Sequence, residues 1–147
     1  MGFQQSDHEA AMYRRGTGEE LLLIGVYVDD LIITGASAQA IEGFKARIKK
    51  VFDMSDLGLL SFYLGVEVHQ DPAGITLRQT HYAKRILDLG GMDACNPTHT
   101  PMEERLRLSR QSTAAKVDPT QYRRLVGSLR YLVHTRPDLA FSVGFVS

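Results

Sequence analysis

The sequence predicts an α+β fold, with an antiparallel sheet and its helix first and a mainly helical segment last. Three observations carry this prediction. Two apolar, β-branched runs flank a polar pair within residues 21–35, apolar and polar residues alternate over 62–69, and an apolar stripe of helical spacing occupies 122–133. Sheet elements followed by helices, rather than alternating with them, indicate the α+β class.

The first elements are a predicted hairpin and a helix. The hairpin spans residues 21–35 with Asp29-Asp30 at its tip, and because its strands are apolar on both faces we expect them inside a covered sheet. Ser37 is the predicted N-cap of the helix, whose two faces are apolar and basic. The apolar residues are Ile41, Phe44, Ile48 and Phe52, and the basic ones are Lys45, Arg47, Lys49 and Lys50.

A strand, a turn, a returning strand and a short helix are predicted next. Residues 62–69 read as one half-buried strand, residues 71–74 (Asp-Pro-Ala-Gly) as a turn, and Ile75 begins the returning strand. Thr80 is the predicted cap of the short helix, and Gly90-Gly91 is its stop.

Residues 95–117 contain two prolines, several Ser and Thr and little periodicity, so we expect a long surface connection with a short strand or turn near Leu106 and Leu108. The helix that follows has Asp118 as its N-cap, Pro119 in the first helical position and Gln121 completing a capping box. Its apolar stripe is Tyr122, Leu125, Val126, Leu129, Leu132 and Val133. Pro137 is predicted to end it, and residues 138–146 to begin another helix.

Composition limits the class of protein. The 147 residues are 44% hydrophobic and 23% charged, which excludes a disordered chain and leaves room for one core, so we expect one compact unit. The apolar stretch 21–28 is far too short to cross a membrane, and residues 1–20 lack the apolar core of a signal peptide. A single cysteine, Cys95, excludes a disulfide framework. We therefore expect an intracellular protein that does not associate with membranes.

The net charge of zero conceals an asymmetry. Residues 1–75 hold 11 acidic and 6 basic side chains, whereas residues 76–147 hold 6 acidic and 11 basic ones. This asymmetry favours a polyanionic partner for the second half, but solvated helix faces produce the same pattern.

The pair Asp29-Asp30 is the candidate catalytic and metal-binding site. Two adjacent carboxylates on a hairpin repel each other, and a divalent cation removes that repulsion. Carboxylates that hold Mg²⁺ are typical of phosphoryl-transfer sites. The alternative is a merely polar turn, since Asp favours turns. The apolar strands on both sides favour the metal, because they make the tip rigid.

The stretch Tyr27-Val28-Asp29-Asp30, followed by Leu-Ile-Ile-Thr-Gly, resembles the catalytic hairpin of reverse transcriptases in the form found in copia-type LTR retrotransposons. Virtually the whole chain takes part in the resemblance. The further segments are 2–6, 52–58, 62–68, 95–97, 100–103, 122–132 and 134–138. The resemblance implies a partial palm over residues 1–79, with the catalytic and primer-grip hairpins, and a thumb or connection segment over 80–147.

The resemblance also implies roles for residues of both hairpins. Asp29 and Asp30 match the catalytic carboxylates that bind two Mg²⁺ (or Mn²⁺) ions, and Tyr27 and Val28 match the positions beneath the incoming nucleotide and the primer end. The reaction it implies is attack of a primer 3′-hydroxyl on the α-phosphate of a deoxynucleotide, so the implied partners are an RNA/DNA primer–template duplex and a dNTP. The residues that match the primer grip are Tyr63, Leu64, Gly65 and Val66. Of these, Leu64 and Val66 also suit a core, whereas a glycine allows nucleic-acid backbone to approach closely.

Arg123, Gly127 and Tyr131 are spaced i, i+4, i+8 and so form one ridge beside the apolar stripe. In the family the matching ridge follows the minor groove of the duplex, and Arg124 and Arg130 would add attraction to phosphates. Two alternatives stay open: Gly127 permits close helix packing, and Arg123 is simply solvated. A glycine inside a helix costs about 1 kcal/mol relative to alanine, so it usually has a reason.

Two expected parts of the family pattern do not match residues of this chain. A working polymerase needs a third carboxylate from an upstream palm strand, and it needs the fingers. We therefore expect little or no activity without the N-terminal half of the polymerase. The alternative is a domesticated, nonenzymatic remnant that binds nucleic acid or a protein. An uncovered palm edge predicts self-association. The family context implies a cytoplasmic location, in a virus-like particle, or a nuclear one.

Overall fold

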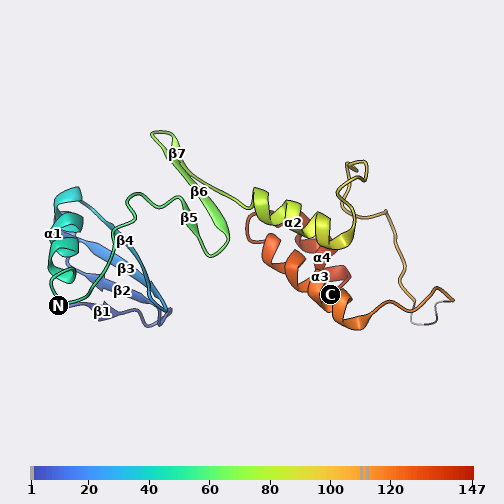
Figure 1. The fold of residues 1–147 in the computed structure, drawn as a ribbon, viewed down its shortest axis with the longest axis horizontal. Helices are drawn as coiled ribbons and strands as arrows, with labels where there is room; N and C mark the ends of the chain where they lie inside the picture. The colour runs from blue at the N-terminus through green and yellow to red at the C-terminus, as the bar shows by residue number, and fades with distance from the viewer. Residues whose placement is uncertain (1, 110, 112) are drawn as a thin grey trace. The chain divides into compact units, whose positions relative to one another are not determined.

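The structure is a computed structural model that describes residues 2–109, 111 and 113–147 (Figure 1). It has the predicted α+β composition, with antiparallel sheets and four α-helices in this part of the chain. The chain divides into two compact units, the first ending at Leu60 and the second beginning at Ser61. The expectation of one compact unit is therefore wrong. The predicted palm–thumb boundary at residue 79 concerns function and stays a prediction.

The first unit is a four-stranded antiparallel sheet with one α-helix, α1, packed on its strand β4 (Figure 1). Its elements are β1 (Gln4–Gln5), β2 (Met12–Arg15), η1 (Gly18–Glu20), β3 (Leu22–Tyr27), β4 (Asp30–Gly35) and α1 (Ala38–Ile48), and the strand order is β1-β2-β3-β4. The core consists of Leu22, Ile24 and Phe44. Phe3 packs edge-on against Phe44, with 5.3 Å between ring centroids.

The N-cap of α1 is confirmed, because the Ser37 hydroxyl accepts a hydrogen bond from the Ala40 N–H at 3.2 Å. The predicted extension of the helix to Phe52 is wrong: α1 ends at Ile48, and Phe52 is 56% exposed. Helices gain most of their stability by packing, and Phe52 lacks such support. The strands are also not covered on both faces, since Leu23 and Gly25 are only half-buried between the buried residues of β3.

The second unit holds a three-stranded antiparallel sheet followed by helices. Its elements are β5 (Phe62–Tyr63), β6 (Val66–Asp71), β7 (Gly74–Arg78), α2 (Thr80–Gly90), α3 (Pro119–Leu132), η2 (Pro137–Leu139) and α4 (Ala140–Phe145). Helix α3 packs against both α2 and α4, and each of the three helices buries one apolar side chain. These side chains are Ile86, Leu132 and Val143.

The prediction of a single strand over residues 62–69 is wrong. The chain reverses at Leu64-Gly65, so Tyr63 pairs with Val66 across a two-residue turn. Alternation alone could not reveal this turn, because Leu64 itself fits the apolar pattern. The resemblance had implied a hairpin here, and the structure contains one. The turn at 71–74 is confirmed, and the Asp71 carboxylate accepts hydrogen bonds from the N–H groups of Ala73 and Gly74.

Helix α2 begins differently from the prediction. Gln79, not Thr80, is the N-cap, and its side chain makes no capping bond. Instead, the Glu67 carboxylate of β6 accepts the His81 N–H at 2.9 Å. An unsatisfied amide of the first turn is thus paired with an acid from a neighbouring strand. The predicted stop is confirmed, because Gly91 has the left-handed conformation of a C-cap, with φ 64°.

Between α2 and α3, the described residues form bends and turns, with a turn at residues 104–105 and no strand near Leu106 or Leu108. The start of α3 is confirmed, since the Asp118 carboxylate accepts the Thr120 N–H at 2.8 Å. Its predicted end is wrong: α3 stops at Leu132, and Pro137 instead opens a 3₁₀ turn that leads into α4. The turn of chain between them lets α4 pack back on α3. Within the described residues, every helix is too short or too polar to span a membrane.

Candidate functional site

The β3–β4 hairpin has a two-residue turn, Val28-Asp29, closed by the pair Tyr27 and Asp30. Val28 has φ 55°, and its side chain is 85% exposed. A positive φ is unfavourable for a β-branched residue, and such strained positions cluster at functional sites. The hairpin predicted around the aspartate pair is therefore confirmed, with Asp29 in the turn and Asp30 as the first residue of β4.

Both carboxylates are exposed. In the part of the chain that the structure describes, neither has a hydrogen-bond or ion-pair partner. Two adjacent acids without a cation repel each other, which fits a divalent cation between or beside them. No group of three His, Cys, Asp or Glu side chains that could hold a metal occurs among residues 2–109, 111 and 113–147. The pair therefore fits part of a metal site.

The β5–β6 turn, predicted as the primer grip, is also strained. Leu64 has φ 49° and Gly65 has φ 84°, and two positive φ values are characteristic of a type I′ turn. Such turns favour Asn-Gly, so a leucine in the first position is unusual. Tyr63 and Val66 are half-buried, whereas Leu64 is 44% exposed.

Tyr131 of α3 secures this turn. Its hydroxyl donates a hydrogen bond to the Leu64 carbonyl oxygen. A Cβ atom added to Gly65 would lie 3.6 Å from a Tyr131 ring carbon, which is ordinary contact. Gly65 is thus explained by its positive φ. The Tyr131 ring also packs edge-on against Tyr82 and His134, with 5.2 Å between centroids in each pair. The predicted grip and the predicted ridge on α3 are therefore in direct contact.

The other two ridge residues, Arg123 and Gly127, lie on the solvent-exposed surface of α3. No atom of the described residues lies within 4 Å of a Cβ atom added to Gly127. Packing between helices of this chain therefore does not explain that glycine. Arg124 and Arg130 are exposed as well.

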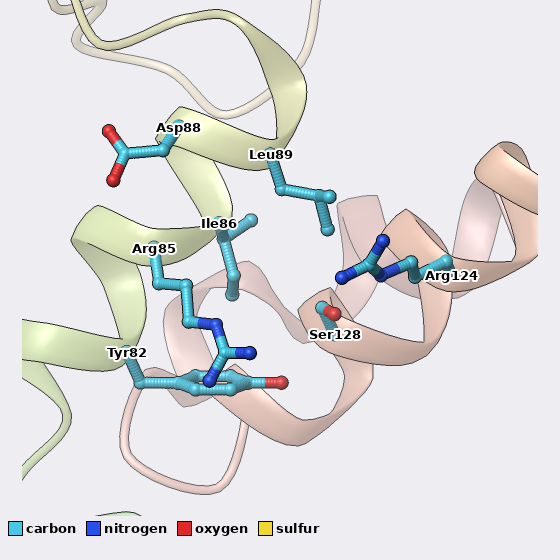
Figure 2. Close-up of a pocket in the computed structure, with 7 residues that line it drawn as sticks. All are labelled: Tyr82, Arg85, Ile86, Asp88, Leu89, Arg124 and Ser128. Carbon is cyan, nitrogen blue, oxygen red and sulfur yellow. The ribbon is translucent and has the colours of Figure 1, made fainter.

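A groove of about 460 Å³ lies between α2 and α3 (Figure 2). Figure 2 shows Arg85 from α2 and Arg124 from α3 extending into it, while the Asp88 carboxylate points away from Arg124. The lining residues are Tyr82, Arg85, Ile86, Asp88, Leu89, Arg124 and Ser128. Sequence reasoning missed this groove, because a basic residue on a polar helix face gives no signal until the neighbouring helix is placed.

The contact between Glu67 and His81 was missed for the same reason. The Glu67 carboxylate accepts from the His81 N–H and lies 2.9 Å from the His81 Nδ1. These two hydrogen bonds, the backbone one first, hold the pKa of Glu67 below its usual value. They connect β6 to the first turn of α2.

Comparisons with known proteins agree on one family. Residues 1–104 match the family "Reverse transcriptase (RNA-dependent DNA polymerase)". An uncharacterized mitochondrial protein of Arabidopsis thaliana is 40% identical over 121 residues, which are 82% of this chain and 50% of that protein. The retrovirus-related Pol polyprotein from transposon RE1 of the same plant is 33% identical over all of this chain, which covers 10% of the polyprotein.

The putative transposon Ty5-1 protein of Saccharomyces cerevisiae is 30% identical over all of this chain and 48% of its own length. The chain thus spans half or less of these relatives. No solved structure matches it. The match over residues 1–104, together with the transposon relatives, shows that the chain belongs to the reverse transcriptase (RNA-dependent DNA polymerase) family, in the form found in copia-type LTR retrotransposons.

Proposed function

We propose that this chain is the part of a retrotransposon reverse transcriptase that carries two catalytic carboxylates, the primer grip and the thumb helix. In this assignment, residues 1–79 belong to the palm and 80–147 to the thumb or connection. The reaction is RNA-directed DNA synthesis, in which a primer 3′-hydroxyl attacks the α-phosphate of a dNTP and pyrophosphate leaves. The partners are an RNA/DNA primer–template duplex and the dNTP.

The observation that carries the proposal is the position of Asp29 and Asp30 on a tight, strained hairpin at the end of an edge strand. In the described sheet, β4 pairs with β3 on one side and is the last strand on the other. A further strand added there would run beside Asp30, where it could supply a third carboxylate. Two metal ions held by such a set would stabilise the charge on the attacking and leaving oxygens.

The primer is assigned to the second unit. Gly65 in the Leu64-Gly65 turn carries no side chain, which allows close approach of the primer end to the turn. Helix α3 presents Arg123, Gly127 and Arg130 to solvent. An open glycine beside arginines suits the surface of a duplex, because the helix can approach it while the guanidinium groups reach phosphates.

The chain alone is proposed to be inactive, because two carboxylates cannot position two metals. The required partner is the N-terminal half of the polymerase core. The free edge of β4 also supports self-association, in which two copies pair through this strand. Light scattering of the purified protein tests this: a dimer is expected, and a clean monomer at high concentration contradicts it. The proposed location is intracellular, cytoplasmic in a virus-like particle or nuclear.

Primer extension on an RNA template tests the activity. The chain is assayed alone and fused to the polymerase segment that precedes the matching region in the Pol polyprotein of transposon RE1. The expected result is Mg²⁺-dependent extension by the fusion only, abolished in the variant Asp29→Asn/Asp30→Asn. The matched control is Asp7→Asn/Asp53→Asn, which removes the same two charges at two other exposed aspartates of the first unit.

Two outcomes would contradict the proposal. Extension by the fusion that survives loss of both aspartates would remove their catalytic role. Extension by the chain alone, lost with the aspartates, would show that a third carboxylate from upstream is not needed.

A nonenzymatic remnant is the second candidate. It is favoured by the basic balance of residues 76–147, which hold 11 basic and 6 acidic side chains. Such a protein would bind nucleic acid or a protein through the basic second half. The fusion protein would distinguish this candidate from a polymerase: a remnant would bind the duplex but incorporate no nucleotide into the primer, whether or not Asp29 and Asp30 were present.

A further inference from the structure

We propose that the groove between α2 and α3 binds a backbone phosphate of the nucleic-acid strand beside the duplex-binding ridge of α3, with Arg85 and Arg124 as its cationic ligands. This inference rests on the proposed function and extends it to helix α2, which that function does not use.

The two arginine side chains of the groove are available to bind an anionic ligand. Arg85 and Arg124 are both exposed, and neither has a hydrogen-bond or ion-pair partner among the residues that the structure describes. They belong to different helices and extend into the same space (Figure 2). Asp88, the acidic lining residue, has no ion pair with either arginine in this part of the chain, and its carboxylate points away from Arg124. Two free guanidinium groups in one groove attract an anion, and their planar donors suit phosphate oxygens.

The helical geometry places the groove beside the ridge. Arg124 and Ser128 each follow a ridge residue by one position, which is a rotation of about 100° around an α-helix. When the ridge of Arg123, Gly127 and Tyr131 faces the minor groove, the neighbouring row faces one of the two strands that border that groove. The phosphates of that strand would then meet Arg124 from one side and Arg85 of α2 from the other.

The remaining lining suits a strand better than a free ion. A volume of about 460 Å³ falls within the range of small-molecule sites and exceeds the need of one phosphate group. Ser128 adds a hydroxyl donor to the groove. The half-buried Tyr82 ring is held edge-on against Tyr131, which in turn binds the Leu64 carbonyl. The groove is therefore connected through Tyr82 and Tyr131 to the turn that is proposed to grip the primer.

The test is the salt dependence of duplex binding. A fluorescent RNA/DNA primer–template duplex is titrated with the full chain at several salt concentrations. Arg85→Gln is expected to weaken binding and to reduce the slope of log K against log salt by about 0.9, the value for one lost phosphate contact. Lys84→Gln is the matched control, because it removes the same charge from the neighbouring exposed position of α2 outside the groove. Arg85→Lys should restore part of the slope, since it restores the charge without the planar fork.

The outcomes separate this inference from the proposed function. If Arg130→Gln weakens duplex binding while Arg85→Gln matches Lys84→Gln, the groove proposal fails alone and the proposed duplex surface stands. If the chain does not bind duplex, both fail. If a dNTP displaces the duplex from the wild-type chain and not from Arg85→Gln, the groove holds a free nucleotide and the strand assignment is wrong.

Discussion

Replacing Tyr131 by phenylalanine tests how the Leu64-Gly65 turn of the β5–β6 hairpin is held in place. The change removes the hydroxyl that donates to the Leu64 carbonyl and keeps the ring that packs against Tyr82 and His134. Leu64 has φ 49°, a left-handed conformation that costs a residue with a side chain about 1–2 kcal/mol. The Tyr131 bond offsets part of that cost.

The expected loss follows from the exposure of the site. A neutral hydrogen bond contributes about 0.5–1.5 kcal/mol, and water can replace the donor at an exposed turn, so the loss should be about 0.5–1 kcal/mol. At 1.36 kcal/mol for each factor of ten, this corresponds to about a two- to fivefold faster opening of the hairpin. The Tyr131→Phe variant should therefore exchange the hairpin amides faster by that factor.

Hydrogen exchange measures this locally. The Val68 amide is a suitable reporter, because it donates to the Ser61 carbonyl at 2.8 Å within the same hairpin. Tyr82→Phe is the matched control, since the Tyr82 hydroxyl has no hydrogen-bond partner among the described residues and its ring packs against the same tyrosine. Equal protection of Val68 in both variants would refute the role assigned to the Tyr131 hydroxyl.

The other predictions concern stability. Gly35→Ala should destabilise the first unit by about 1–3 kcal/mol in urea unfolding, because its Cβ would lie 2.7 Å from a backbone carbonyl oxygen. Gly43→Ala, where no atom of the described residues lies within 4 Å of the added Cβ, should stabilise the unit by about 1 kcal/mol. The reverse order of the two stabilities would contradict the packing. The pKa of Glu67 is lowered in the folded chain, so its contribution is present above the ordinary carboxyl pKa and is lost as pH falls through the lowered value. Acid should therefore lower the protection factor of the His81 amide, which compares its exchange rate with that of an unfolded chain at the same pH. An unchanged acid response in Glu67→Gln would count against this. Asp118→Ala should lower the unfolding free energy of the second unit by about 1 kcal/mol through loss of the N-cap, and an unshifted urea midpoint would disprove that contribution.

Local signals in the sequence predicted several features correctly. Ser37 and Asp118 cap their helices as expected, and Gly91 ends α2 in the left-handed conformation. The hairpin around Asp29-Asp30 also forms as predicted, although its register puts Val28 and Asp29 in the turn and Asp30 at the start of β4. Each of these features depends on residues that are close together in the chain, which is why pattern and capping rules suffice for them.

The features that were missed depend on contacts between distant segments. The carboxylate that pairs with the first turn of α2 comes from Glu67, 14 residues before His81. The Tyr131 bond to Leu64 joins residues 67 positions apart. The end of α1 at Ile48 follows from packing and not from periodicity, which continues to Phe52. No spacing rule identifies such partners before the helices and strands are placed.

The roles of the candidate site residues came from resemblance rather than from geometry. The structure places Asp29 and Asp30 on a hairpin tip and connects Leu64 to α3, but charge and spacing alone would equally suit a polar turn. Arg85, in contrast, was identified from geometry alone. It belongs to no sequence motif, and it lines a groove only because α2 lies against α3.

The long connection between α2 and α3 has a consequence for how the second unit could be cut and rejoined. It comprises the 28 residues between Gly90 and Pro119. Halving the length of such a connection changes the entropic cost of closing it by only about 0.6 kcal/mol, so the pairing of the two helices depends mainly on their contact. A protease should nick this segment first, leaving two fragments that stay together through α2 and α3. New chain ends could be introduced at the same place, which makes it the natural junction for a split or circularly permuted form of this protein.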